Sequence, residues 1–203
     1  MSLPEISSLS PLPDDQLLST LDLLFEPSPS LHSLALPILR SSQFSSYAEL
    51  ITSVGEQLRS LSSKAFPSQD RSINPGVPTG GDEESKKQLL DILGSHPRLG
   101  EKKLTALSGL SKEEQGHLRG EIERLMEMNR VYEERFPGLR YVVWVNGRST
   151  TEIEENAGRR VNRGNYTAEV EEIIQVGDDC CLSFGFEVFR EKGGWGEFGV
   201  ETA

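Results

Sequence analysis

The strongest constraint on the fold is a periodic run of mostly apolar residues in the second half of the chain. The run consists of Leu118, Ile122, Leu125, Asn129, Tyr132 and Phe136, at alternating spacings of four and three residues. That spacing is typical of one buried helix face. It predicts a long amphipathic helix from Ser111 to about Arg135, ended by Pro137 and Gly138. Asn129 lies on the apolar face, so we expect its amide to be hydrogen-bonded inside the protein.

Shorter apolar stripes predict further helices along the chain. They fall at residues 17–25, 31–39, 44–61, 89–93, 151–163 and from Tyr166 onward. Residues 141–145 have the composition of a strand, but a single short strand has no partner with which to form a sheet. The expected fold is therefore all-α, a helical bundle with one short extended segment near 141–145. We expect Arg159, Arg160 and Arg163 to form a solvated face or a dimer rim.

The length of 203 residues fits one domain, which can bury a sizeable core. We predict the domain to span residues 14–190, with flexible tails at 1–13 and 191–203. Residues 65–86 are rich in Pro, Ser, Gly and Asp, and so predict a long loop inserted between helices.

The net charge of −11 argues against nucleic acid or an anionic membrane as a partner. No apolar run is long enough for a membrane span, and the first residues lack the basic region of a signal peptide. The final residues are not the peroxisomal address Ser-Lys-Leu. We therefore expect a cytoplasmic or peroxisomal protein, with the cytoplasm favoured. Cys180 and Cys181 are adjacent and are expected to be reduced thiols, and no metal-ligand spacing is recognisable.

His96 is the histidine with the most constrained position. Pro97 follows it and pushes it toward an extended backbone, so the helix before it is expected to end there. A helix C-terminus favours a protonated imidazole. A surface or capping histidine is the alternative interpretation.

Ser111 and Glu114 match a capping box, in which the serine and the glutamate satisfy backbone N–H groups at a helix start. The apolar stripe extended backward also passes through Ser111, Glu114 and Gln115. Glu114 would then face the core, where a carboxylate is costly unless it is paired or used. Both a cap and a functional carboxylate are consistent with the sequence.

Four motifs occur here in a specific order: His-Pro-Arg-Leu-Gly (96–100), Ser-x-x-Glu-Gln (111–115), Met-Asn-x-x-Tyr (128–132) and Phe-Pro-Gly-Leu-Arg-Tyr-Val-Val (136–143). Together they resemble 2-oxo-4-hydroxy-4-carboxy-5-ureidoimidazoline (OHCU) decarboxylase, with a fungal character. The resemblance covers roughly residues 14–190. It implies an all-helical, cofactor-free enzyme that forms a homodimer.

The resemblance also implies a set of site residues. His96 would be the catalytic acid/base and Glu114 its carboxylate partner, while Pro97, Ser111 and Gln115 would line the substrate pocket. An ungapped alignment gives Val143 and Asn146 the remaining substrate contacts. Asn146 stands where the family often has arginine, and Arg148 lies two residues later. An anionic substrate needs nearby basic groups, for which the candidates are Arg98, Lys102, Lys103 and Arg148.

By resemblance, the reaction is the decarboxylation of OHCU to S-allantoin in urate catabolism. The alternative is a catalytically inactive or repurposed helical module that binds a ureide or a protein partner. A third interpretation is a purely structural bundle, in which the box around Ser111 is only a helix cap. An Arg148 side chain pointing into the pocket beside His96 would favour the enzyme.

Overall fold

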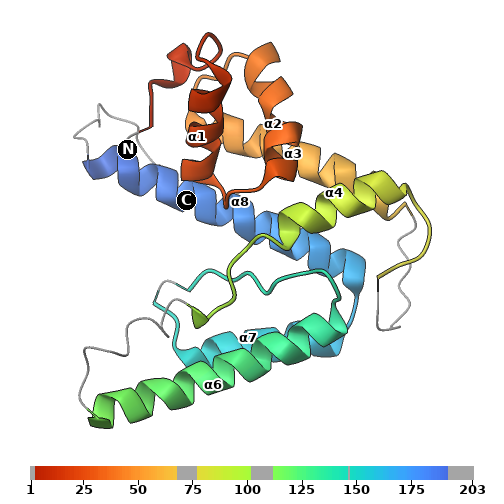
Figure 1. Cartoon of the computed structure of the whole chain (residues 1–203), viewed down its shortest axis with the longest axis vertical. Helices are drawn as coiled ribbons and strands as arrows, with labels where there is room; N and C mark the ends of the chain where they lie inside the picture. Colours follow the sequence, from red (N-terminus) through yellow and green to blue (C-terminus); the bar gives the residue numbers. More distant parts are fainter. Residues whose placement is uncertain (1–2, 68–76, 102–111, 146, 192–203) are drawn as a thin grey trace, which may run out of the picture.

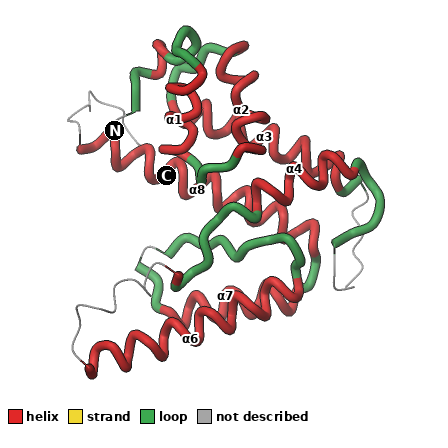
Figure 2. The backbone as a smooth tube through the Cα atoms, viewed as in Figure 1, coloured by secondary structure: helices red, strands yellow, loops and turns green. Residues whose placement is uncertain are grey.

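The computed structural model describes residues 3–67, 77–101, 112–145 and 147–191, and for 112–118 and 183–191 it describes the backbone alone. These residues form a short 3-10 helix and a set of α-helices without any strand (Figure 2). The elements are η1 (Ile6–Ser8), α1 (Asp14–Leu24), α2 (Pro29–Ser41), α3 (Tyr47–Ala65), α4 (Glu83–Leu93), α6 (Lys112–Arg135), α7 (Thr150–Arg163) and α8 (Tyr166–Glu191). The predicted all-α fold is confirmed, and residues 141–145 form the expected extended segment.

Helix α8 runs through the middle of the molecule, and the other helices are arranged around it (Figure 1). It packs on α3 over a long stretch and also contacts α1 and α4. Helices α1 and α2 pack together beside α3, whereas α6 and α7 lie side by side on the other side of α8. The extended segment 139–145 connects α6 to the loop before α7, and so passes between the two groups of helices.

The long stripe of α6 is buried as its spacing predicts. Ile122, Leu125, Tyr132 and Phe136 are all less than 5 % exposed. Asn129 is buried among them, and its Nδ2 donates to the backbone oxygen of Leu99 at 2.9 Å, which confirms its expected hydrogen bond. This bond attaches α6 to the segment that follows His96.

Side-chain caps fix several helix starts. The hydroxyl of Ser46 accepts from the N–H of Glu49 at the start of α3, and the carboxylate of Asp82 accepts from the N–H of Ser85 at the start of α4. Ser149 begins α7 with a capping box. These caps satisfy N–H groups that a helix start leaves without partners. The caps of α3 and α4 fix the starts of two helices that line the cavity described below.

Arg160 corrects the prediction of a solvated arginine face on α7. Its side chain is 3 % exposed, and its Nε donates to Oε1 of Glu169, itself fully buried, at 2.7 Å. Tyr132 also donates to Oε1, and Nη2 of Arg163 donates to Oε2 at 2.7 Å. Burial of these charges is tolerated because they are paired and hydrogen-bonded. The predicted exposure holds for Arg159 and Arg163 but is wrong for Arg160.

The described residues before α1 pack on the fold, which differs from the loose tail expected for 1–13. Leu9 is 2 % exposed. The Tyr47 hydroxyl donates to the backbone oxygen of Pro4 at 2.9 Å. Among the helices that the structure describes, none has a stretch both long and apolar enough to cross a bilayer.

Candidate active site

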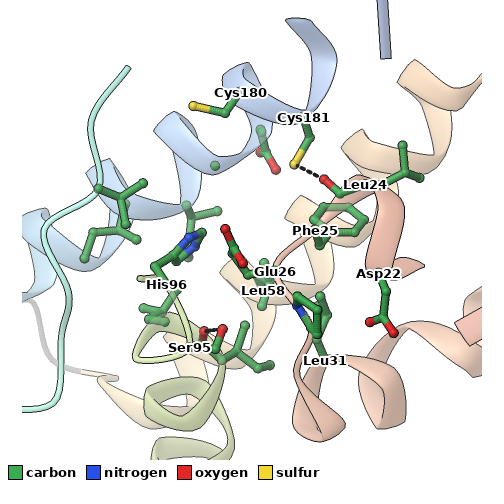
Figure 3. A pocket seen from close by; sticks show the side chains of 18 of the residues that line it. Asp22, Leu24, Phe25, Glu26, Leu31, Leu58, Ser95, His96, Cys180 and Cys181 are labelled. Carbon is green, nitrogen blue, oxygen red and sulfur yellow. Dashed lines mark hydrogen bonds between the residues drawn. The ribbon is translucent and has the colours of Figure 1, made fainter. Parts of the chain in front are cut away.

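A cavity of about 480 Å³ lies at the junction of α1, α3, α4, α8 and the extended segment. Its wall is mostly apolar, and its ionisable or thiol-bearing lining residues are Asp22, Glu26, His96, Asp178, Cys180 and Cys181. Figure 3 shows the His96 ring and the Glu26 carboxylate pointing into the same space. An apolar cavity with a few convergent polar groups is the expected form of a small-molecule site.

The turn after α4 presents His96 to this cavity. Helix α4 ends at Leu93, and the N–H of Gly94 bonds to the backbone oxygen of Leu90 at 2.8 Å. Both the N–H and the hydroxyl of Ser95 then bond to the backbone oxygen of Ile92, at 3.1 and 2.6 Å. Pro97 follows His96 and restricts its backbone. The imidazole is therefore held at a fixed position just beyond the helix end, as its sequence predicts.

The protonation state of His96 differs from the expectation. Desolvation lowers the pKa of His96 below its ordinary value, and the negative charge of Glu26 opposes that shift only in part. The helix end alone would favour the charged imidazolium, but burial against an apolar wall disfavours it more. The lowered pKa favours the neutral imidazole at neutral pH, so burial outweighs the effect expected from the helix end.

Glu26 is the carboxylate that the structure places beside His96 (Figure 3). It lies in the short connection between α1 and α2, where Phe25 is extended and Ser28 caps the next helix. Sequence analysis assigned no role to Glu26. The available signals were a single acidic residue inside a proline-rich break between two apolar helices, and the resemblance, which implies an acidic residue near the pocket at this position.

Helix α8 contributes a carboxylate and two thiols to the wall. Cys181 is buried, and its Sγ donates to the backbone oxygen of Leu24 at 2.9 Å. Burial raises the pKa of Cys181 to about 12 and also raises that of Cys180. Both are free thiols, in agreement with the predicted reduced state, and neither is a thiolate nucleophile at neutral pH.

The extended segment presents a different side chain from the one predicted. Val142 and Trp144 line the cavity, whereas Val143 is not among the lining residues. Successive side chains in an extended chain point to opposite sides, so a shift of one residue exchanges the two faces. The backbone oxygen of Val142 accepts from Nη1 of Arg160 at 2.8 Å, which fixes the orientation of this segment.

The remaining predicted site residues are not brought to the cavity, or lie outside the described residues. Arg148 is exposed and does not line the cavity. Arg98 is engaged by Glu133, with Nε and Nη2 donating at 2.7 and 2.8 Å. Pro97 is partly buried next to His96 but is not a lining residue. Ser111, Asn146, Lys102 and Lys103 lie outside the described residues, as do the side chains of Glu114 and Gln115.

The charge of the cavity follows from these placements. Among the described lining residues the ionised groups are carboxylates, and no lysine or arginine lines the space. No cluster of three or more metal-binding side chains occurs within the described part of the chain. What the described residues offer is a neutral imidazole, hydrogen-bond acceptors and an apolar wall. That combination can accept and return a proton on a bound molecule that carries N–H groups.

Comparison with known proteins gives one match. A family model described as OHCU decarboxylase matches residues 10–179. No match was found among curated proteins, and none among solved structures. The match spans most of the chain and includes all the residues that line the cavity except Cys180 and Cys181. By this match the chain belongs to the OHCU decarboxylase family.

Proposed function

We propose that this protein catalyses the cofactor-free decarboxylation of OHCU to S-allantoin in urate catabolism, with His96 as general acid/base. The observation that carries the proposal is a neutral imidazole held in the apolar cavity of a chain from this family. The fungal character, the homodimer and the handedness of the product are further expectations from the sequence. Light scattering of the purified protein would test the dimer.

The chemistry of the substrate limits what the protein must supply. The carboxylate of OHCU is on a ring carbon that also carries a hydroxyl and is bonded to the carbon of a ring C=N. When CO₂ leaves, the electron pair of the broken bond forms a C=C bond to the neighbouring ring carbon. The pair of the C=N bond moves onto the ring nitrogen, which takes up a proton, so the substrate is its own electron sink. The hydroxyl then loses its proton and becomes a carbonyl, while the neighbouring carbon gains a proton. The protein must therefore hold the substrate, exclude water and move protons.

The described residues suit these tasks. A neutral His96 can accept the hydroxyl proton, and the resulting imidazolium can return a proton to the carbon on one face of the ring. The Glu26 carboxylate stabilises that transient positive charge, since its own negative charge favours protonation of His96. Roles for Glu114, Ser111, Gln115 and Asn146 stay predictions from the resemblance.

The assay generates OHCU from urate, adds the protein, and follows the circular dichroism of the allantoin formed. OHCU also decays without an enzyme, so the rate must exceed that of a reaction without protein. His96→Ala should lower the catalysed rate by about 10²–10⁴-fold, the usual range for a lost general acid/base. His32→Ala is a matched control, since His32 is paired with Asp22 on α1. Near-full activity of His96→Ala would refute the assignment.

A second function is favoured by the charge of the cavity. OHCU is an anion, yet Arg148 is exposed and the ionised groups on the described wall are carboxylates. A protein that binds a neutral ureide without decarboxylating OHCU is consistent with that wall. Racemic allantoin, formed at the rate of the reaction without protein, would favour this binding module over the enzyme.

A further inference from the structure

Asp178 is a buried carboxylate on α8 that lines the same cavity as His96. Its residue is 8 % exposed, so little water reaches the charge. Desolvation raises the pKa of Asp178 above its ordinary value, although the charge of Arg59 opposes the shift. A carboxylate in that position gains from any further hydrogen-bond donor that reaches it.

The position of the Asp178 carboxylate is fixed from two sides. Gly55 on α3 leaves the space that the carboxylate fills, since a methyl group there would lie 2.7 Å from Oδ1 and 2.8 Å from Cγ. Nη2 of Arg59 donates to Oδ2 at 3.0 Å. Arg59 is itself fixed by Glu171 and Gln175, to which it donates at 2.7 and 3.0 Å. The carboxylate therefore cannot turn freely.

One oxygen of Asp178 has acceptor capacity left. Oδ2 accepts from Arg59, but no donor from the described residues bonds to Oδ1. Oδ1 is not among the described buried side-chain atoms that lack both a partner and accessible surface, so part of its surface is accessible, and Asp178 is a lining residue of the cavity. By contrast, Asp22, at the rim of the same cavity, is exposed and already accepts from His32 at 2.6 Å. Asp178 is thus the fixed, desolvated acceptor of this wall.

We propose that Asp178 is a specificity-determining residue that accepts hydrogen bonds from the ureido N–H groups of the ligand. This inference rests on the proposed function, which supplies the identity of the substrate. The contact with Asp178 would make the site selective for a ureide. A ureido group is neutral and presents N–H donors on one edge. It can therefore bond to a buried carboxylate without bringing a second negative charge against it. The carboxylate of OHCU must then lie at another part of the site.

The test compares two neutral probes by isothermal titration calorimetry. Allantoin carries the ureido group, and hydantoin is the same ring without it. Asp178→Asn keeps the shape of the side chain. Arg59 needs an acceptor, so the variant amide should turn its oxygen to Arg59 and its N–H₂ to the cavity, where a donor would face the donors of the ligand.

Asp178→Asn should weaken allantoin binding about ten- to hundredfold, the loss expected for a hydrogen bond to a charged group. The affinity of Asp178→Asn for hydantoin should stay within about twofold of the wild-type affinity, a change well below that expected for one lost hydrogen bond. Asp179 is an exposed neighbour on the same helix, so Asp179→Asn is the matched control. It should change neither the affinity for allantoin nor the affinity for hydantoin. If Asp178→Asn does not fold, Asp178→Ser removes the carboxylate without adding volume.

Three results would overturn the inference: an unchanged affinity for allantoin, an equal loss for both probes, or a wild-type protein that does not prefer allantoin. Failure of the proposed function gives a different result. Wild-type protein would then leave the decay of OHCU unaccelerated, while the two-probe comparison would still report on Asp178.

Discussion

Glu169 and Asp178 are both buried carboxylates on α8, but their surroundings differ. Glu169 is fully buried and its two oxygens accept from Tyr132, Arg160 and Arg163. Asp178, which lines the cavity, accepts from Arg59 through one oxygen, and part of the surface of the other is accessible. A buried polar group that supports the fold has its hydrogen bonds filled within the chain. A group that binds a ligand must keep some of that capacity unfilled, and in this respect Asp178 in the middle of α8 differs from Glu169 in its first turn.

The largest expected effect is on stability, from the loss of Glu169, whose oxygens accept hydrogen bonds from Tyr132, Arg160 and Arg163. Glu169→Ala leaves the Arg160 guanidinium buried without its main partner, so the free energy of unfolding should fall by about 3–5 kcal/mol. Urea denaturation followed by circular dichroism measures it. Glu155→Ala, an exposed carboxylate on α7, should change the midpoint little. If Glu169→Ala and Glu155→Ala lowered the free energy of unfolding equally, Glu169 and its partners would not stabilise the fold.

Alanine variants of the extended segment test which of its side chains contacts a ligand in the cavity. Val142 lines the cavity and Val143 does not, so Val142→Ala should raise KM for OHCU about tenfold, at the low end of the range for a lost pocket contact. Val143→Ala should leave KM close to that of the wild type. Steady-state kinetics of both variants measure this difference. The reverse order would favour the substrate contact by Val143 that the resemblance implies.

The pH profile tests the pair of His96 and Glu26. The proposed mechanism needs the neutral imidazole, so it predicts that kcat/KM falls as the pH drops below the ordinary pKa of histidine, about 6.5. The negative charge of Glu26 raises the pKa of His96, and its removal in Glu26→Gln lowers that pKa further. The variant should therefore keep a larger fraction of its own neutral-pH kcat/KM in acid.

Glu84→Gln, an exposed change on α4, is the control for that profile and should match the wild type. An acid limb that stays in place in Glu26→Gln, or that moves to higher pH, would contradict electrostatic coupling between the two side chains.

The smallest expected effect is on the stability of Asp178→Asn. The pKa of Asp178 is raised in the folded state, so the folded state binds a proton more readily than the unfolded one. Folding stability linked to this group is therefore present at low pH and is lost as the pH rises through the folded pKa. At neutral pH, Asp178→Asn should unfold at the same urea concentration as the wild type or at a slightly higher one. A clearly lower midpoint would mean that Asp178 supports the fold as Glu169 does.

Local spacing predicted much of the fold. The four-and-three spacing of Ile122, Leu125 and Tyr132 indicated the buried face of α6, and even the buried hydrogen bond of Asn129 followed from its place on that face. These features depend only on helix periodicity, which is visible in the sequence as the spacing of apolar residues. The position of His96 beyond a helix end followed from Pro97 in the same way.

Features that depend on distant partners could not be predicted in this way. Arg160 was expected on a solvated face or dimer rim, but it is buried, because its partner Glu169 is on the next helix. The neutral state of His96 depends on a cavity wall contributed by several helices. The choice between Val142 and Val143 depends on a single-residue register, which composition does not fix.

The backbone oxygen of Val142 joins the two regions compared above. Nη1 of Arg160 donates to it, while Nε of the same guanidinium donates to Glu169. A local opening that released residues 142–144 would break a bond to a buried guanidinium, which is far costlier than ordinary loop fraying. The segment therefore belongs to the same cooperative unit as α7 and α8. In native-state hydrogen exchange we expect it to open with those helices, which makes this wall of the cavity a preformed surface for a ligand.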